Sequence, residues 1–599
     1  MLLAVKRQRS RSPRVTPTAG AGEAVLWRPV LATAIVTLVA YANAISDQFT
    51  LDDIAFSVVA RNANLRLLVG LFGEDAWFHT RHVVSGVYRP LALATIVFES
   101  LLHGGAAWAL HLTNVLLHVA TTLVLGGFLS ALVRDARGRG GAPLARGASL
   151  APWCAASVFG VHPVHTEAVD SIFNRSEVLA TLGVVGALWI VWRHRRELGP
   201  RVWVAVSALF LVALFSKESG VTLPLLVVVV VGVLAPEPWR LRVRQLARVA
   251  SLAVPLGLYL AARESAVPWP AVGPSRLEVY LGSESWSQRW TMVVSTTLDA
   301  WKLLLWPHPL RAFHDTDPVH RLALSASVHA AIVGASLALW RRFPPLLAGV
   351  AGFYVAILPS TRLATDLSPV VQVFAERYVY LPSAMAAIPL AFGFAWLEAR
   401  WGRRSLLAAA AIACTLLSAR TIVRNQDWRG DIALFSAECA VDLENNRVTL
   451  HLARSLLEAG RSADLAAFCR RYLARHPNRT EMLKVCARGF EREGRLDDGE
   501  AALMRVWTRD GTARALIALA RFHERSGDRE RSEIEFQLGL SRRATPFNMH
   551  MSLGEMIARR LPARMAEARA EFETAAAINP RSDVPREWIR RIDANEPLP

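Results

Sequence analysis

The sequence predicts an all-α protein in which a bundle of membrane-spanning helices precedes a soluble array of helical hairpins. Three observations support this prediction. The 599 residues are 53% apolar without glycine, with a mean hydropathy of +0.27, whereas soluble domains reach about 45–50% with glycine included. Apolar runs recur from about Val30 to Val423 and are absent afterwards. The segment after them carries a helical repeat instead.

The positive charge belongs to the apolar part of the chain. The formal net charge is +18, of which residues 1–425 hold +16 and residues 426–599 hold +2. Lys and Arg that flank apolar spans report the orientation of a membrane protein. We therefore expect no nucleic-acid partner, despite the high isoelectric point.

The apolar runs predict about eleven spans, each close to the ~20 residues needed to cross a bilayer. They are 29–46, 108–133, 148–163, 176–192, 202–216, 220–236, 247–262, 322–340, 344–360, 378–397 and 404–423. The connections 134–147, 193–201, 240–248, 341–342 and 398–404 all fall on the same side as the basic N-terminus only if 90–102 and 291–306 do not span. The positive-inside rule therefore makes these two stretches interfacial or re-entrant helices on the outer face.

This topology divides the chain into three parts. Residues 1–28 form a basic cytoplasmic N-terminus, and no clear cleavage site follows the first apolar run, so we expect a retained helix. Residues 29–425 form a membrane domain with long outer loops at 47–107 and 263–321. Because the number of spans is odd, residues 426–599 are expected outside the cytoplasm.

The soluble tail repeats with a period of about 34 residues. Small residues recur at one position and glycines recur at the following turn: Ala453, Ala487, Ala520 and Gly554, and Gly460, Gly494 and Gly527. This is the tetratricopeptide pattern, in which a small residue lets two helices approach closely, and about four units fit. A generic array of α-hairpins is the alternative. Such arrays present a concave surface for a protein or peptide segment.

The cysteines predict neither a metal site nor a disulfide framework. Their number is odd, and no CxxC or metal-type spacing occurs among Cys154, Cys414, Cys439, Cys469 and Cys486.

Ionisable side chains gather at the outer ends of the predicted spans. They are Asp52 and Asp53, then Arg89, then His162, His165, Glu167 and Arg175, then Lys217 and Glu218, and finally Glu376 and Arg377. Each group alone is compatible with a helix cap, a salt bridge or a snorkelling side chain. The histidine spacing is not that of a helical zinc site, so we expect no bound metal. Together, cations beside carboxylates suit a site that holds a lipid-linked phosphate and deprotonates a hydroxyl.

The ordered motifs resemble those of one family. They are "LDD" after the first span, "YRPL", "HLTNVLLH", "HPVHTEAV" followed by "NRSE", "SKESGVTLP", "AERYVYLPS" and "RN..W" before the repeats. From about residue 30 to 580 the chain is similar to the transmembrane and tetratricopeptide-repeat O-mannosyltransferases and their bacterial homologues.

The resemblance implies an enzyme with a GT-C glycosyltransferase fold. Such enzymes transfer a sugar from a polyprenyl phosphate donor to an acceptor hydroxyl, by default on a protein Ser or Thr, at the outer membrane face. The base would be Asp52 or Asp53. Contacts to phosphate or substrate, or orienting roles, would fall to Arg89, His162, His165, Glu167, Arg175, Lys217, Glu218, Glu376 and Arg377. No cofactor is required beyond the lipid-linked sugar, and a divalent metal ion is optional.

The arginine content indicates where the protein works. The chain holds 64 Arg and only 4 Lys, which suggests a GC-rich bacterial genome. We therefore expect the bacterial inner membrane, a periplasmic repeat domain that helps to recruit the acceptor, and an undecaprenyl-phosphate-linked donor.

Two readings from other classes compete with a transferase. A non-enzymatic scaffold would use the spans only to anchor the repeats for envelope proteins, but eleven spans exceed what an anchor needs. A lipid-linked sugar transporter would place ionisable groups in the middle of its spans, whereas these groups lie at the outer ends.

Overall fold

The computed structural model describes residues 27–598 except 47, 82–84, 137–148, 198, 268–284, 315–320, 362, 364–373, 542–546, 561–563, 581 and 595. The predicted basic N-terminus therefore lies almost wholly outside the described residues. The chain forms two compact units, Met1–Val441 and Asp442–Pro599. All regular structure in the described ranges is helical, which confirms the predicted fold class.

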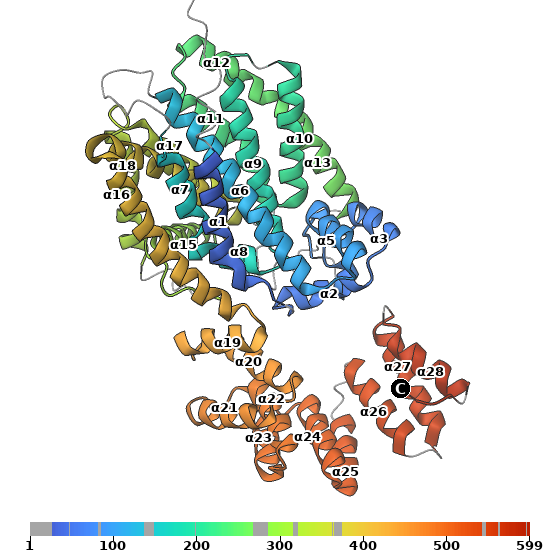
Figure 1. The fold of residues 1–599 in the computed structure, drawn as a ribbon. Helices are drawn as coiled ribbons and strands as arrows, with labels where there is room; N and C mark the ends of the chain where they lie inside the picture. The colour runs from blue at the N-terminus through green and yellow to red at the C-terminus, as the bar shows by residue number, and fades with distance from the viewer. Residues whose placement is uncertain are drawn as a thin grey trace, which may run out of the picture. The chain divides into compact units, whose positions relative to one another are not determined.

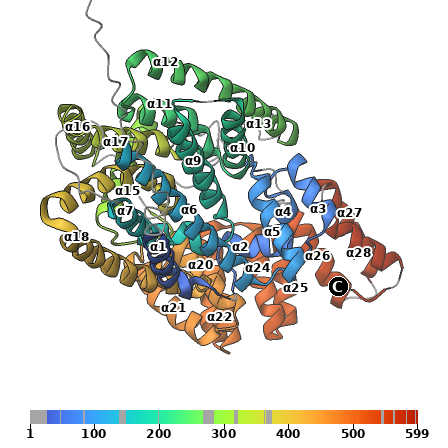
Figure 2. The same ribbon diagram turned by 45° about the horizontal axis from the view of Figure 1, so that its top comes forward.

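Helices of 9–48 residues, apolar apart from the arginine-rich segment 239–247, build the first unit (Figures 1 and 2). They are α1 (Trp27–Tyr41), α6 (Ala107–Ala136), α7 (Ala151–Gly160), α9 (Arg175–His194), α10 (Pro200–Ser216), α11 (Leu223–Leu234), α12 (Trp239–Ala247), α13 (Ala253–Ala266), α16 (Leu322–Ala338), α17 (Pro344–Ile357) and α18 (Tyr380–Asp427). By length and composition, four helical stretches of the described chain are able to cross a membrane: Ala107–Ala136, Arg175–His194, Trp239–Ala266 and Glu376–Asp427. Shorter apolar helices accompany them, and each predicted run falls on one of the helices named here.

Helix α18 contains two of the predicted spans. At Gly402 the backbone leaves the helical region, with φ 83° and ψ 170°, and two helical arms meet there. Glycine adopts such positive φ values without the steric penalty that a Cβ atom brings. A single residue thus makes the bend for which the sequence suggested a short loop at 398–404.

Small residues allow these helices to pack closely. A Cβ atom on Gly349 of α17 would lie 2.3 Å from Cδ of Pro389 in α18, and one on Gly126 of α6 would lie 2.5 Å from the ring of Trp153 in α7. Close contact of this kind drives helix association in lipid, where apolar burial adds little.

The segment that follows α1 folds into short helices. They are α2 (Asp52–Arg61), α3 (Leu65–Gly70), α4 (Phe78–Arg81) and α5 (Pro90–His103). Their apolar side chains form a separate small core, in which Phe56, Leu93 and Val97 pack with Phe173 from a distant loop. Phe56 and Phe173 stack with ring centres 4.2 Å apart. This core attaches α2 to the start of α9. The second interfacial stretch of the prediction lies in α15 (Trp286–Leu305).

The second unit is an array of helical hairpins. Its helices are α20 (Asn446–Glu458), α21 (Ser462–Arg475), α22 (Thr480–Arg492), α23 (Leu496–Asp510), α24 (Ala513–Ser526), α25 (Arg529–Ser541), α26 (Phe547–Arg560), α27 (Met565–Ile578) and α28 (Val584–Asp593). The predicted turn glycines Gly460, Gly494 and Gly527 all have positive φ. A Cβ atom on Gly554 would lie 2.8 Å from the ring of Phe572, so this position does require a small residue.

Helix α19 (Asp431–Val441) joins the first unit, although it lies beyond the last apolar run. The boundary between the units therefore falls after Val441, later than position 425. Glu438 of α19 is 1% exposed and lies 3.5 Å from Arg424 at the end of α18, and Leu434 of α19 packs with Ala312 and Trp428. A helix of 11 residues is too short to be detected as a membrane span by hydropathy.

The expectation of no disulfide framework is wrong for the repeat unit. Cys469 of α21 and Cys486 of α22 form a disulfide, with Cα atoms 5.6 Å apart, whereas Cys154, Cys414 and Cys439 are outside any disulfide of the described residues. The two cysteines lie 17 residues apart in sequence, and only the antiparallel packing of two amphipathic helices brings them together.

Removing this disulfide is expected to destabilise the repeat unit. A cross-link over a loop of this length contributes about 3 kcal/mol to stability. We expect Cys469→Ser and Cys486→Ser each to lower the thermal midpoint of the purified protein and to expose the repeats to protease, while Cys439→Ser leaves both unchanged. Alkylation before and after reduction, read by peptide mass spectrometry, checks the bond directly. Labelling of Cys469 without reduction would contradict it.

Candidate active site

Three cation–carboxylate pairs meet where α5, α8 (Thr166–Asp170), α9, α10 and the start of α18 come together. Arg89 binds Glu218, with Nη2 2.9 Å from Oε2. Lys217 binds Glu177, and Arg377 binds Glu167. We call these six residues the ion-pair cluster. Its members come from turns that are far apart in sequence, because ionisable groups at the ends of apolar helices must find partners there.

Short helical turns position the members of the cluster. Arg89 directly precedes α5, and Lys217 lies between α10 and the 3-10 turn Glu218–Thr222. Glu167 lies in the first turn of α8 (Thr166–Asp170), and Glu177 lies in the first turn of α9.

Arg377 belongs to the 3-10 turn Glu376–Val379 that leads into α18. Its backbone N–H also donates to Glu167 over 2.9 Å, so Glu167 holds both the main chain and the side chain of this residue.

Aromatic rings support the cations. The ring of Tyr378 lies between two of them, with its centre 5.5 Å from Nζ of Lys217 and 5.0 Å from Cζ of Arg377. The guanidinium of Arg89 lies 5.6 Å from the ring centre of Phe173. Such contacts orient a cation over the electron-rich face of a ring.

The two arginines of the cluster are partly exposed, and Glu167 is buried. The side chains of Arg377 and Arg89 are 19% and 11% exposed, and that of Glu167 is 2% exposed. Glu218 binds the Nε and Nη2 edge of Arg89, which leaves the Nη1 side for another acceptor. Burial lowers the pKa of Lys217 to about 8, and the neighbouring Glu177 opposes this shift. The arrangement suits an anion such as a phosphate ester.

The two adjacent aspartates have different surroundings. Asp53 is fully buried and accepts three hydrogen bonds, from Oγ of Ser171 (3.1 Å) and from the backbone N–H groups of Ile172 (2.9 Å) and Phe173 (2.8 Å). Burial raises the pKa of Asp53 to about 7, although these hydrogen bonds lower it. Asp53 therefore fastens α2 to the loop before α9.

Asp52 is exposed and begins α2. It lies close enough to Arg377 to raise the pKa of that guanidinium. The preceding Leu51 has a φ of 55°, which is strained for a residue with a branched side chain. Its backbone N–H donates to Oδ1 of Asp431 over 2.7 Å, and this bond holds the strained turn.

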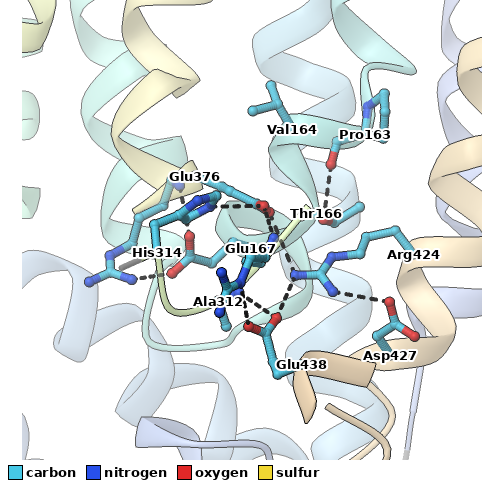
Figure 3. A network of polar contacts seen from close by, with 12 residues as sticks. Pro163, Val164, Thr166, Glu167, Ala312, His314, Glu376, Arg424, Asp427 and Glu438 are labelled. Atoms are coloured by element: carbon cyan, nitrogen blue, oxygen red, sulfur yellow. Dashed lines mark hydrogen bonds and ion pairs between the residues drawn. The ribbon is translucent and has the colours of Figure 1, made fainter. Parts of the chain in front are cut away.

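Glu376 makes its contacts with a second set of residues, which Figure 3 draws together with Glu167 of the ion-pair cluster. It accepts hydrogen bonds from His314 and from the backbone of Arg311, and it lies 3.7 Å from Arg424. Arg424 also contacts Asp427 and Glu438, and Glu438 accepts from the backbone of Ala312. This network ties the segment before α16 to both ends of α18.

Three further predicted site residues are separated from the cluster. His162 donates from Nε2 to the carbonyl of Leu304 (3.0 Å), and its Nδ1 accepts from Val164. His165 contacts Oγ of Ser383 (2.8 Å) inside the bundle.

Burial, followed by repulsion from His162 and His118, lowers the pKa of His165 well below its usual value. Arg175 binds Glu99 and donates from Nε to Asn114 over 2.6 Å. Within the described chain, no group of three or more His, Cys, Asp or Glu side chains is arranged to hold a metal ion.

Several residues of these networks did not emerge as candidates from the sequence. Glu177 and Tyr378 adjoin candidates within the quoted motifs, so the motifs contained a signal for them. Arg424 lies in the "RN..W" motif. Nothing in the sequence marks Glu438 or Glu99, because their partners lie on helices that meet them only in the folded chain.

The two aspartates are expected to differ when each is replaced by asparagine. In Asp53→Asn one carboxylate oxygen becomes an N–H₂ group that faces a backbone N–H, which costs about 1–3 kcal/mol. We expect a lower thermal midpoint for Asp53→Asn and a change within about 0.5 kcal/mol for exposed Asp52→Asn. Thermal unfolding followed by intrinsic fluorescence measures both. Equal midpoints for the two variants would contradict an anchoring role for Asp53.

Comparison with known proteins yields one set of relatives. No family model matches the chain. It is 27% identical over 504 residues to protein O-mannosyl-transferase Tmtc3 of Drosophila melanogaster, and 25% identical over 493 residues to protein O-mannosyl-transferase TMTC4 of Mus musculus. Each match covers 72% of this chain, but only 53% of the fly protein and 64% of the mouse protein.

A shorter match is 34% identical over 161 residues, to protein O-mannosyl-transferase Tmtc2 of Drosophila melanogaster, and covers 25% of this chain. These similarities confirm the resemblance to the transmembrane and tetratricopeptide-repeat O-mannosyltransferases that the ordered motifs predicted.

Proposed function

We propose that the chain is a membrane glycosyltransferase that moves a sugar from a polyprenyl-phosphate donor to a Ser or Thr hydroxyl of a protein. The observation that carries this proposal is the ion-pair cluster beside the exposed carboxylate of Asp52. The cations of the cluster would contact the donor phosphate, and the carboxylate of Asp52 would take the proton of the acceptor hydroxyl. The names of the relatives, protein O-mannosyl-transferases, support sugar transfer to a protein.

The cations take the leaving group in this scheme. Arg89 and Arg377 present their accessible edges to the phosphate of the donor, and Lys217 adds positive charge behind them. Negative charge grows on the bridging oxygen as the bond from the sugar to phosphate breaks, so fixed cations stabilise the transition state more than the ground state. Buried Glu167, Glu177 and Glu218 hold these side chains in place before the donor binds.

Asp52 acts as the base. The carboxylate takes the proton of the acceptor hydroxyl, whose oxygen attacks the anomeric carbon while the electron pair of the breaking bond leaves on the phosphate. A single displacement of this kind inverts the anomeric configuration. General base catalysis contributes about 10²–10⁴-fold. The strained turn at Leu51, held by Asp431, limits the orientations open to Asp52.

We place this chemistry and the repeats on the non-cytoplasmic face of a bacterial inner membrane. The distribution of arginines among the connections supports that orientation. The Cys469–Cys486 disulfide supports it independently, because such bonds persist in oxidising compartments.

Replacing the base should abolish transfer without unfolding the protein. We expect Asp52→Asn to reduce the glycosylation of envelope proteins by about 100-fold or more. The measurement is a mass-spectrometric profile of Ser- and Thr-linked sugars in a deletion strain complemented with wild type, Asp52→Asn or Arg61→Gln. Arg61 also lies in α2, at its other end, and serves as the matched control. Membrane abundance is equalised by immunoblot.

Two outcomes would count against the proposal. A wild-type sugar profile in the strain with Asp52→Asn would show that Asp52 is not the base. An unchanged profile in the deletion strain itself would favour the scaffold reading, in which only the repeats matter.

The orientation has its own test. Protease added to intact spheroplasts should digest the repeat unit while a cytoplasmic marker stays whole, because the repeats lie outside. The repeat fragment is followed with a C-terminal epitope. Protection of the epitope until the membrane is permeabilised would place the repeats inside the cell.

A further inference from the structure

The repeat unit contains a groove with a strong local charge. A cavity of about 500 Å³ is lined by α20, α22 and α24, the first helices of three successive hairpins. These helices contact one another directly. The groove therefore runs across the array.

The repeat places arginines at equivalent positions along this groove. Arg454, Arg488 and Arg521 follow one another at the repeat spacing, one from each helix, and all line the cavity. Arg492 and Arg525 form a second row one turn further along α22 and α24. The tail as a whole is nearly neutral, with +2 over residues 426–599. The positive charge is thus concentrated on one face.

The carboxylates of the unit do not neutralise these rows. Arg525 is bound by Glu491 over 2.6 and 2.8 Å, whereas Arg454 lies 3.7 Å from its nearest carboxylate, Glu481. Arg492 donates to the backbone carbonyl of Leu457 over 2.6 Å, which compensates no charge.

The arginines are also close enough to repel one another. Burial lowers the pKa of Arg521, Glu555 raises it, the positive charges of Arg488 and Arg525 lower it further, and Glu524 raises it. An anion that enters such a cluster is attracted by all of its positive charges, and this attraction lowers the free energy of the complex.

We propose that this groove binds an acidic segment of another protein in an extended conformation. Neighbouring packed helices lie about 8–10 Å apart, and three residues of an extended chain span about 10 Å. A segment with Asp or Glu at about every third residue therefore offers one carboxylate to each arginine of the row. Val485 and Phe522 give the groove an apolar floor for the residues between them. The proposal does not depend on the transfer reaction.

The test measures binding of one defined probe to the full-length protein in nanodiscs of neutral phosphatidylcholine. The probe is a fluorescent peptide with Asp at every third position and Ala or Ser between, and the matched probe carries Asn instead. Fluorescence anisotropy should show binding of the Asp peptide only. Binding should weaken as salt rises, because exposed charges are screened.

Charge-reversal variants locate the site. We expect Arg488→Glu and Arg454→Glu, both at exposed positions, each to weaken binding by about tenfold or more. The matched control is Arg505→Glu on α23, exposed and outside the groove, which should bind like wild type. Arg488→Ala should give a smaller loss than Arg488→Glu. An unchanged thermal midpoint confirms that each variant is folded.

Three results would overturn the proposal. If the Asn peptide binds as tightly as the Asp peptide, charge does not determine binding. Equal losses with Arg505→Glu and Arg488→Glu would place binding elsewhere. Preferential binding of a single-stranded oligonucleotide or of phosphatidylglycerol vesicles, sensitive to Arg488→Glu, would assign the groove to a different class of ligand.

Discussion

A charge at the end of an apolar helix must be paired, and the candidate site of this protein is organised by that requirement. Arg89 meets Glu218, Lys217 meets Glu177, and Arg377 meets Glu167, in each case between segments that are distant in sequence. Removing one partner of a buried pair leaves an uncompensated charge, which costs about 3–5 kcal/mol. The pairs therefore set the positions of the turns around them, and the proposed base and phosphate contacts inherit this geometry.

The fold was predictable where a periodic signal exists. Apolar runs marked the long helices, and a 34-residue period marked the repeats, because both patterns repeat many times along the chain. The role of α19 escaped notice, since a helix of 11 residues is too short to give a span-length apolar run, and its partners Arg424 and Trp428 are known only from the fold. The Cys469–Cys486 bond escaped for a similar reason: an odd cysteine count says nothing about which pair two packed helices bring together.

The candidate site was predictable only as a set of residues. The motifs identified the candidate side chains, but the structure places them in separate groups. Glu376 goes to the Arg424 network, His165 to the interior of the bundle and Arg175 to Glu99. Sequence spacing also left Asp52 and Asp53 equivalent. Their difference arises from the loop at 171–173, more than 100 residues away, which donates three hydrogen bonds to the carboxylate of Asp53.

The bend at Gly402 has a consequence for the position of the ion-pair cluster. Glu376, directly before Arg377, lies 3.7 Å from Arg424, so the two arms of α18 begin and end at one ion pair. The arms and this contact form a closed triangle with Gly402 at its apex. A change in the angle at that apex must either part the ion pair or displace the turn that carries Arg377. The angle at Gly402 is thus coupled to the position of the turn that carries Arg377 of the ion-pair cluster.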